Sequence, residues 1–301
     1  MNFGRLVTAM VTPFNERLEV DYNRAKELAQ YLVSTGSDGL VIAGTTGESP
    51  TLTKEEKIKL FAAVVDAVGD QVPIIAGTGS NDTSSTIALS KEAEAVGVSG
   101  LLLVGPYYNK PSQQGYYQHF SAIAKATSLP IMLYNIPSRT GSNIQPDTVA
   151  SLAQIDNIVA TKEAAGSMDQ VSELIQKVPR DFRIYSGDDG LTLPMMALGS
   201  YGVVSVSGHL VGQEIQRMIQ SFIAGKNEEA AAIHRQLFGL FKGLFVATNP
   251  IAVKAALKLI GQPVGGLRLP LIDASPEEIE FLKKLLKKHG LLECNCNCKC
   301  S

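Results

Sequence analysis

Short apolar runs alternate with longer segments of helical periodicity along most of the chain. The runs are hydrophobic at consecutive positions, which is typical of parallel strands covered by helices on one side and by a core on the other. Eight such runs span Leu6 to Phe14, Gly39 to Gly44, Val72 to Gly77, Gly100 to Pro106, Pro130 to Pro137, Ile158 to Glu163, Phe182 to Gly187 and Gly202 to Ser207. The helical segments that follow them in turn are Asp21 to Ser34, Thr53 to Val68, Thr83 to Val96, Ser112 to Thr127, Pro146 to Ala153, Met168 to Val178, Leu191 to Leu198 and Gln213 to Ala224.

This alternation predicts an α/β fold in which residues 1–225 form a closed (β/α)8 TIM barrel, because no linker-like or low-complexity break separates the units. Thr53 opens a capping-box pattern, and Gly97, Gly199 and Gly225 stand where helices are expected to end. Residues 226–290 predict a C-terminal helical extension, with helices near Glu228 to Phe245, Pro250 to Ile260 and Ser275 to Lys288.

The composition is that of a soluble globular protein. Of 301 residues, 45% are hydrophobic and 19% are charged, and 27 basic against 29 acidic side chains give a net charge of −2. Nucleic acid is not an expected partner, because phosphate binding requires clustered Lys and Arg. No apolar stretch approaches about 18 residues, and residues 1–5 lack the apolar core of a signal peptide, so we expect a cytoplasmic protein.

Cysteine and histidine give little support to a metal site. All four cysteines lie at every second position from Cys294 to Cys300, whereas zinc-binding pairs are usually two to four residues apart. We therefore expect residues 291–301 to be a disordered tail without a catalytic role. The histidines are widely separated, and no Gly-x-Gly-x-x-Gly motif opens a helix, so neither a metal nor a dinucleotide cofactor is expected.

Active sites of TIM barrels lie at the C-terminal ends of the strands. The second strand ends in a glycine-rich turn with Thr45 and Thr46, which suits a small carboxylate or phosphate but is also compatible with an ordinary capped turn. The fourth strand ends in Tyr107 and Tyr108. Adjacent residues of an extended chain point in opposite directions, so at most one of these tyrosines is expected to face the site, and packing at an interface is the alternative.

The fifth and sixth strands end in the most informative residues. Tyr134 offers a phenol, and Arg139 offers a guanidinium that could bind a carboxylate in bidentate fashion or form a surface salt bridge. Lys162, near the end of an apolar strand, must either extend outward to solvent or point into the site. Burial would lower its pKa and favour the neutral amine that attacks a carbonyl, so Lys162 is the candidate nucleophile.

Four motifs together resemble those of the 4-hydroxy-tetrahydrodipicolinate synthases, within the pyruvate-dependent class I aldolases. They are Gly44-Thr45-Thr46-Gly47-Glu48, Pro106-Tyr107-Tyr108-Asn109-Lys110-Pro111, Tyr134-Asn135-Ile136-Pro137-Ser138-Arg139-Thr140-Gly141 and Lys162-Glu163. The resemblance covers residues 3 to 290. It implies that Lys162 forms an imine with pyruvate and that the derived enamine adds to L-aspartate 4-semialdehyde, in lysine and diaminopimelate biosynthesis. No cofactor is implied, because the protonated imine is itself the electron sink.

The resemblance also implies roles for the other candidates. Tyr134 would relay protons through Thr45 to Tyr108, with Tyr108 contributed by a partner subunit in a homotetramer. The substrate-binding groups would be Thr45 and Thr46 at the pyruvate carboxylate, Arg139 at the semialdehyde carboxylate, and backbone near Gly187 and Val204.

One departure from the family concerns inhibition by lysine. Members that lysine inhibits place histidines and a glutamate around an allosteric pocket, whereas this chain has Lys54, Lys57 and Ser85 at the matching positions. Extra cations would repel the ammonium groups of lysine, so weak or absent inhibition is expected. The alternatives to the synthase are another pyruvate aldolase, such as an N-acetylneuraminate or keto-deoxy-sugar lyase, and a barrel that binds a small molecule without catalysis.

Overall fold

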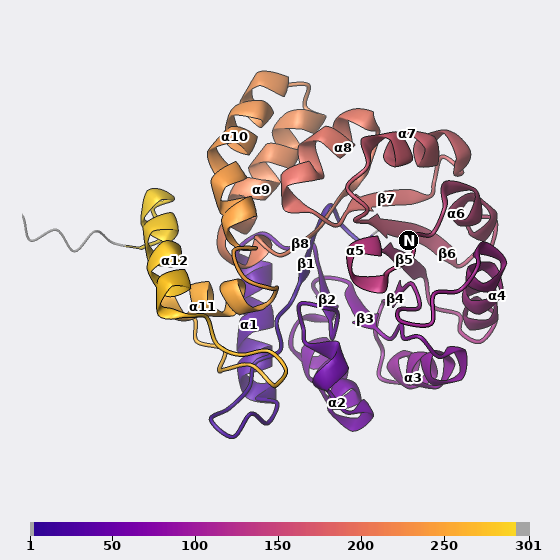
Figure 1. Ribbon diagram of the computed structural model, residues 1–301, viewed down its shortest axis with the longest axis horizontal. Helices are drawn as coiled ribbons and strands as arrows, with labels where there is room; N and C mark the ends of the chain where they lie inside the picture. Colours follow the sequence, from indigo (N-terminus) through magenta and orange to yellow (C-terminus); the bar gives the residue numbers. More distant parts are fainter. Residues whose placement is uncertain (1–2, 293–301) are drawn as a thin grey trace, which may run out of the picture.

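A closed barrel of eight parallel strands forms the centre of the computed structural model, which describes residues 3–292 (Figure 1). The strands follow one another in sequence order, and β1 pairs with β8 to close the barrel. They are β1 (Leu6–Ala9), β2 (Gly39–Ile42), β3 (Ile74–Gly77), β4 (Gly100–Val104), β5 (Ile131–Asn135), β6 (Ile158–Glu163), β7 (Arg183–Ser186) and β8 (Gly202–Ser205). The predicted TIM barrel is confirmed. The predicted cysteine tail lies, from residue 293 onward, outside the described residues.

Helices surround the barrel and continue beyond it. Around the strands lie α1 (Tyr22–Ser34), η1 (Ser49–Thr51), α2 (Lys54–Val68), α3 (Thr83–Ala95), α4 (Gln113–Ala124), α5 (Pro137–Thr140), α6 (Pro146–Leu152), α7 (Met168–Lys177), η2 (Asp189–Leu191), α8 (Thr192–Leu198) and α9 (Gly208–Ile223). The extension comprises α10 (Asn227–Gly243), α11 (Ile251–Leu259) and α12 (Pro276–Lys288). Thr53 and Ser275 each cap a helix reciprocally with a glutamate at the third helical position.

Helix α9 spans Gly208–Ile223, but Val211 within it has non-helical backbone angles (φ −136°, ψ 39°), so the regular helix after this kink begins next to the predicted start at Gln213. The glycines at this start, Gly208 and Gly212, serve close packing. A Cβ atom at Gly208 would lie 2.4 Å from Thr8 Oγ1, and one at Gly212 would lie 2.5 Å from the Thr35 carbonyl oxygen. The helix therefore approaches the barrel more closely than any side chain would permit.

Strand residues alternate between the barrel interior and the layer beneath the helices. Val7 and Ala9 belong to the interior cluster, whereas Leu6 packs in the outer layer. On the fifth and sixth strands, Tyr134 and Ala160 belong to the interior cluster. Lys162 follows Ala160 by two residues and therefore points to the same side. Alternation alone left both directions open for Lys162, and closure of the barrel decides for the interior.

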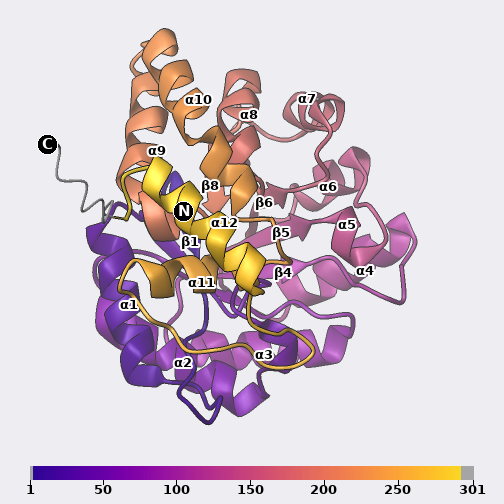
Figure 2. The same ribbon diagram turned by 60° about the vertical axis from the view of Figure 1, so that its left-hand side comes forward.

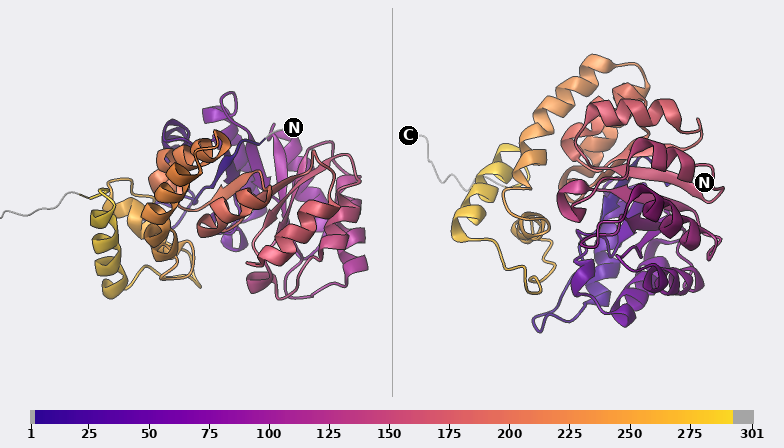
Figure 3. Two further views of the ribbon diagram at one scale, coloured as in Figure 1. Left: turned by 90° about the horizontal axis from the view of Figure 1, so that it is seen from above. Right: turned by 45° about the vertical axis from the view of Figure 1, so that its right-hand side comes forward.

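The C-terminal extension lies on one side of the barrel (Figures 2 and 3). Helix α10 packs along α9, and α12 packs against α10 and α11. The segment after α11 reaches back to the first helix, where Arg24 Nε donates a hydrogen bond of 2.8 Å to the Pro263 carbonyl. Residues near the end of the chain are thereby brought to the loops that follow the first strands.

Candidate active site

Lys162 and Tyr134 lie side by side inside the barrel. Their Cα atoms are register partners between β5 and β6. The Lys162 Nζ lies 4.2 Å from the centroid of the Tyr134 ring, and the lysine is only 6% exposed. Both residues stand near the C-terminal ends of their strands, which is the catalytic end of this fold. The structure thus brings together the two strand-end groups that the sequence analysis singled out.

Burial changes the protonation of Lys162. Loss of solvation lowers its pKa to about 8, with the buried Asp189 carboxylate acting in the opposite direction and the Arg139 charge adding to the decrease. An ordinary lysine with a pKa near 10.5 is almost entirely protonated at neutral pH. The lowered pKa provides a substantial fraction of the neutral amine that nucleophilic attack requires.

The phenol of Tyr134 shifts in the other direction. Burial raises its pKa to about 12, and the nearby Arg139 charge and a hydrogen bond with Thr45 only partly oppose this increase. Tyr134 therefore remains a protonated donor across the physiological range. Lys162 is thus partly neutral, and the adjacent Tyr134 keeps its proton. This pairing allows the amine to attack a carbonyl carbon while the phenol donates a proton to the carbonyl oxygen.

The lowered pKa of Lys162 predicts how the formation of a covalent adduct depends on pH. With pyruvate, the substrate that the resemblance implies, at low concentration, the rate of imine formation should rise about tenfold per pH unit below pH 8 and become constant above it, because the neutral amine is then the major form. The rate is measured by trapping the imine with borohydride at several pH values and reading the mass increase. A rate that still rose tenfold between pH 8.5 and 9.5 would show that Lys162 titrates like an exposed lysine.

A cavity of about 650 Å³ lies beside Tyr134. Thr45, Tyr134 and Arg139 line it, together with Tyr107 and Lys57. Arg139 is exposed on the short helix α5, so its guanidinium is available at the entrance. The cavity is large enough for a small carboxylic acid and an aldehyde at once.

Gly187, directly after β7, borders the buried lysine, and Val204 lies on β8 in the interior cluster. A Cβ atom at Gly187 would lie 3.1 Å from Lys162 Cε and 2.7 Å from Ala164 Cβ, so glycine leaves room for the lysine side chain. Val204, on β8, is buried in the interior cluster. Both positions therefore lie on the inner wall of the barrel.

The two remaining candidates occupy contrasting surroundings. Thr46 is 3% exposed, and its hydroxyl oxygen accepts a hydrogen bond from Asn249. Tyr108 is 89% exposed and has a backbone φ of 70°, an uncommon value for a bulky residue. Within the single chain, the structure does not bring Tyr108 to Thr45 and Tyr134; it is Tyr107 that lines the cavity.

Two buried residues near the site escaped the sequence analysis. Asp189 faces the charge of Lys162 and accepts hydrogen bonds from the Val206 and Ser207 amides at 3.1 and 2.9 Å. Asn249 comes from the extension and contacts Thr46 over 203 residues of chain. The available signal for Asn249 was a polar residue directly before an apolar helix, which is too common to identify a site.

No described group of three His, Cys, Asp or Glu side chains within residues 3–292 is arranged to hold a metal ion. His209, in the first turn of α9, is fully buried, and both its ring nitrogens are engaged by backbone groups of Val11 and Val206. These contacts give it a structural role. No described helix is long and apolar enough to cross a membrane.

The fold and the cavity define a TIM-barrel enzyme of the class that holds a buried lysine at the C-terminal ends of its strands. A family model for the dihydrodipicolinate synthetase family matches residues 2–289, and the chain belongs to this family. It is 67% identical over 291 residues to a 4-hydroxy-tetrahydrodipicolinate synthase of Heliobacterium modesticaldum, with 97% of each chain covered.

Solved structures of the family have the same fold. The dihydrodipicolinate synthase of Bacillus anthracis superimposes with a TM-score of 0.94 at 49% identity, covering 95% of this chain and 98% of that one. The enzyme of Cyanidioschyzon merolae, solved with lysine bound, gives 0.95 at 50% identity, covering 96% and 99%.

Proposed function

We infer that the protein condenses pyruvate with L-aspartate 4-semialdehyde to 4-hydroxy-tetrahydrodipicolinate, for lysine and diaminopimelate biosynthesis in the cytoplasm. The observation that carries this inference is the buried Lys162 beside Tyr134, whose side chain lines a cavity together with Thr45 and Arg139. The names of the relatives supply the choice of substrates within the class of pyruvate aldolases.

The reaction begins at the neutral Lys162 amine. Its lone pair attacks C2 of pyruvate, and the carbonyl oxygen takes up a proton and leaves as water, which gives a protonated imine. The positive imine nitrogen withdraws electrons, so a methyl proton of pyruvate is lost and an enamine forms. The enamine carbon then bonds to the aldehyde carbon of the semialdehyde, whose oxygen is protonated. The amine of the semialdehyde finally displaces Lys162 from C2 and closes the ring, with one water lost overall.

The surrounding residues place and protonate the substrates in this scheme. Tyr134 donates and recovers protons at the reacting oxygens, because its phenol is protonated and adjacent to Lys162. Thr45 and Thr46 hold the pyruvate carboxylate, and the Gly187 and Val204 backbone completes the inner wall. Arg139 binds the semialdehyde carboxylate at the cavity entrance, where its charge is accessible.

Tyr108 completes the proton relay from a second copy of the chain in this proposal. Its exposure of 89% and its left-handed backbone support a residue that is directed away from its own barrel. The assembly we propose is a homotetramer, in which each active site uses Tyr108 of the partner subunit. Sedimentation at micromolar concentration would measure the mass of the assembly.

Substrate choice is tested by measuring consumption of L-aspartate 4-semialdehyde with pyruvate, coupled to the next reductase of the pathway. Turnover of this pair, with no cleavage of N-acetylneuraminate or keto-deoxy sugars, is the expected result, because Arg139 suits a second carboxylate. Cleavage of a sugar acid without activity on the semialdehyde would assign the barrel to another pyruvate aldolase.

We also expect millimolar L-lysine to leave the rate nearly unchanged. Lys54, Lys57 and Ser85 line the same cavity as Thr45. Lys54 forms an ion pair with Glu92, so the repulsion of a bound ammonium group falls mainly on Lys57. The enzyme of Cyanidioschyzon merolae, which has been solved with lysine bound, is the positive control. Loss of half the rate at millimolar lysine would contradict this expectation.

A further inference from the structure

The loop after β2 is tied to the C-terminal extension by a buried side-chain hydrogen bond. Asn249 Nδ2 donates to Thr46 Oγ1 at 2.9 Å, and the two residues are 7% and 3% exposed. Asn249 stands two residues before α11, outside the eight βα units, yet it contacts the threonine next to Thr45. No catalytic function is assigned to Asn249 by the reaction scheme above.

We propose, on the basis of the function inferred above, that Asn249 is a positioning residue that directs the Thr46 hydroxyl proton toward the carboxylate of pyruvate. A hydroxyl group has one proton and two acceptor lone pairs. The Asn249 amide occupies one lone pair, so the proton is directed elsewhere. A carboxylate is an acceptor only, and it receives the strongest hydrogen bonds from a donor whose orientation is already fixed.

An ion pair close to Thr46 explains why the hydrogen bond between Asn249 and Thr46 is held in one geometry. Glu48, two residues after Thr46, forms an ion pair of 2.6 Å with Lys254, and both side chains are at most 2% exposed. Lys254 Nζ also donates to the Gly266 carbonyl at 2.8 Å. Asn249 and Lys254 therefore reach the two ends of one short loop segment from the same part of the extension. A buried pair of this kind is costly to break, because the remaining charge would have no partner.

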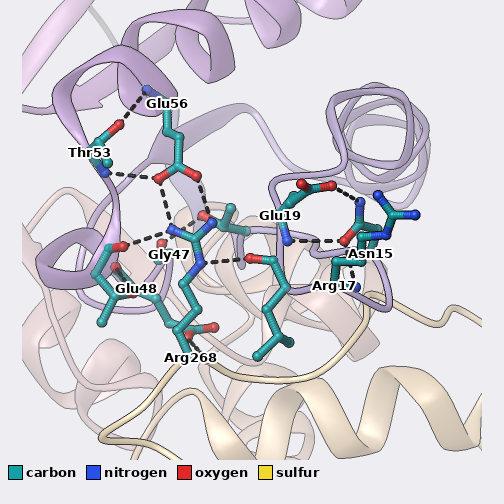
Figure 4. Close-up of polar contacts among 11 residues, drawn as sticks. Asn15, Arg17, Glu19, Gly47, Glu48, Thr53, Glu56 and Arg268 are labelled. Atoms are coloured by element: carbon teal, nitrogen blue, oxygen red, sulfur yellow. Dashed lines mark hydrogen bonds and ion pairs between the residues drawn. The ribbon is translucent and has the colours of Figure 1, made fainter.

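Arg268 binds the segment from Glu48 to Glu56, which follows Thr46 along the chain, as Figure 4 shows. Its guanidinium donates to both carboxylate oxygens of Glu56 at 2.8 and 2.6 Å and to the Thr51 carbonyl at 2.8 Å. Its backbone amide donates to Glu48 at 3.0 Å. The extension thus holds the segment from the threonines to the start of α2 at several points, which leaves Thr46 little freedom to reorient.

The test measures the affinity for pyruvate, by titrating borohydride-trapped adduct against pyruvate concentration, in four variants. Asn249→Ala should weaken pyruvate binding about tenfold, the magnitude expected for a hydrogen bond that supports a charged group. Asn249→Asp, which has the same shape but only accepts hydrogen bonds, should weaken it further, because it draws the Thr46 proton away and adds a negative charge. Thr46→Val should show a similar loss, and adding Asn249→Ala to it should cost less than about twofold more.

A purely structural role predicts the reverse pattern. Asn249→Asp would then be milder than Asn249→Ala, and the losses in the double variant would multiply; either result overturns the proposal. Asn157→Ala is the control, because the amide of this asparagine also donates a hydrogen bond, at 3.0 Å to the Ala124 carbonyl, but at the opposite end of the barrel. It should lower stability without changing pyruvate affinity.

Two further outcomes are decisive. If circular dichroism shows that Asn249→Ala does not fold, Asn249→Ser replaces it. The shorter serine side chain leaves room for water but cannot reach Thr46. Failure of both variants to fold would show that the role of Asn249 is structural alone. If the unaltered protein forms no pyruvate adduct, the proposed function fails. An adduct of equal affinity in the unaltered protein and in Asn249→Ala leaves that function intact and refutes the positioning role.

Discussion

Replacing Lys162 by alanine should reduce kcat/KM by at least about a thousandfold, because it removes the buried amine that lies beside the Tyr134 phenol and that we propose forms the imine. The loss corresponds to at least about 4 kcal/mol of transition-state stabilisation. The steady-state rate with pyruvate and L-aspartate 4-semialdehyde measures it, and borohydride with pyruvate should add no mass to the variant.

Lys162→Arg separates charge from nucleophilicity. Arginine retains the positive charge but cannot become a neutral nucleophile, since it stays protonated in proteins. It should be as inactive as the alanine variant. Activity within tenfold of the unaltered protein in either variant, with folding verified by circular dichroism, would show that the reaction does not pass through Lys162.

The second large effect is expected at Tyr134. Tyr134→Phe keeps the ring that lies 4.2 Å from the lysine amine but removes the proton donor, so kcat should fall by about 10² to 10³. Since the ring remains, borohydride should still trap pyruvate on Lys162, only more slowly. The measurement compares the trapping rate and the turnover rate of the same preparation.

Tyr116→Phe is the matched control for Tyr134→Phe. Tyr116 is also fully buried, and its hydroxyl shares a hydrogen bond of 2.5 Å with Ser142, but it lies on α4 outside the barrel. Its loss should change stability by about 1 kcal/mol and leave kcat within about twofold. If the two variants lost activity equally, the effect at Tyr134 would reflect packing and not proton transfer.

The barrel was predictable because strands buried on both faces and amphipathic helices leave different hydrophobic periods. The start of α9 was less predictable, because the short stretch before the kink at Val211 has no helical periodicity of its own. Gly208 and Gly212 allow this stretch to approach Thr8 on β1 and Thr35 after α1. Nothing in the local sequence distinguishes a glycine used for a turn from a glycine used for close contact.

The candidate site was predictable only where it follows strand ends. Thr45, Tyr134 and Arg139 gather at one cavity because parallel strands bring their C-terminal ends together. The residues that hold the loop of Thr46 and Glu48 were not predictable, since Asn249, Lys254 and Arg268 lie about 200 residues further along the chain. Lys254 is buried on a helix that is otherwise apolar at its buried positions, an anomaly that signals an ionic partner but does not name it.

The C-terminal extension holds the loop after β2, which contains Thr46 and Glu48, by hydrogen bonds and an ion pair. Closure of the barrel and fixation of this loop are therefore separate steps in the synthesis of the chain. All eight strands have been synthesised by Ser205, so the barrel can close while the extension is still being made. Until Lys254 and Arg268 follow, Glu48 has neither its counter-ion nor the Arg268 amide that binds it. A nascent chain with a complete barrel therefore still lacks the contacts that hold Glu48, and these contacts form only after Arg268 has been synthesised.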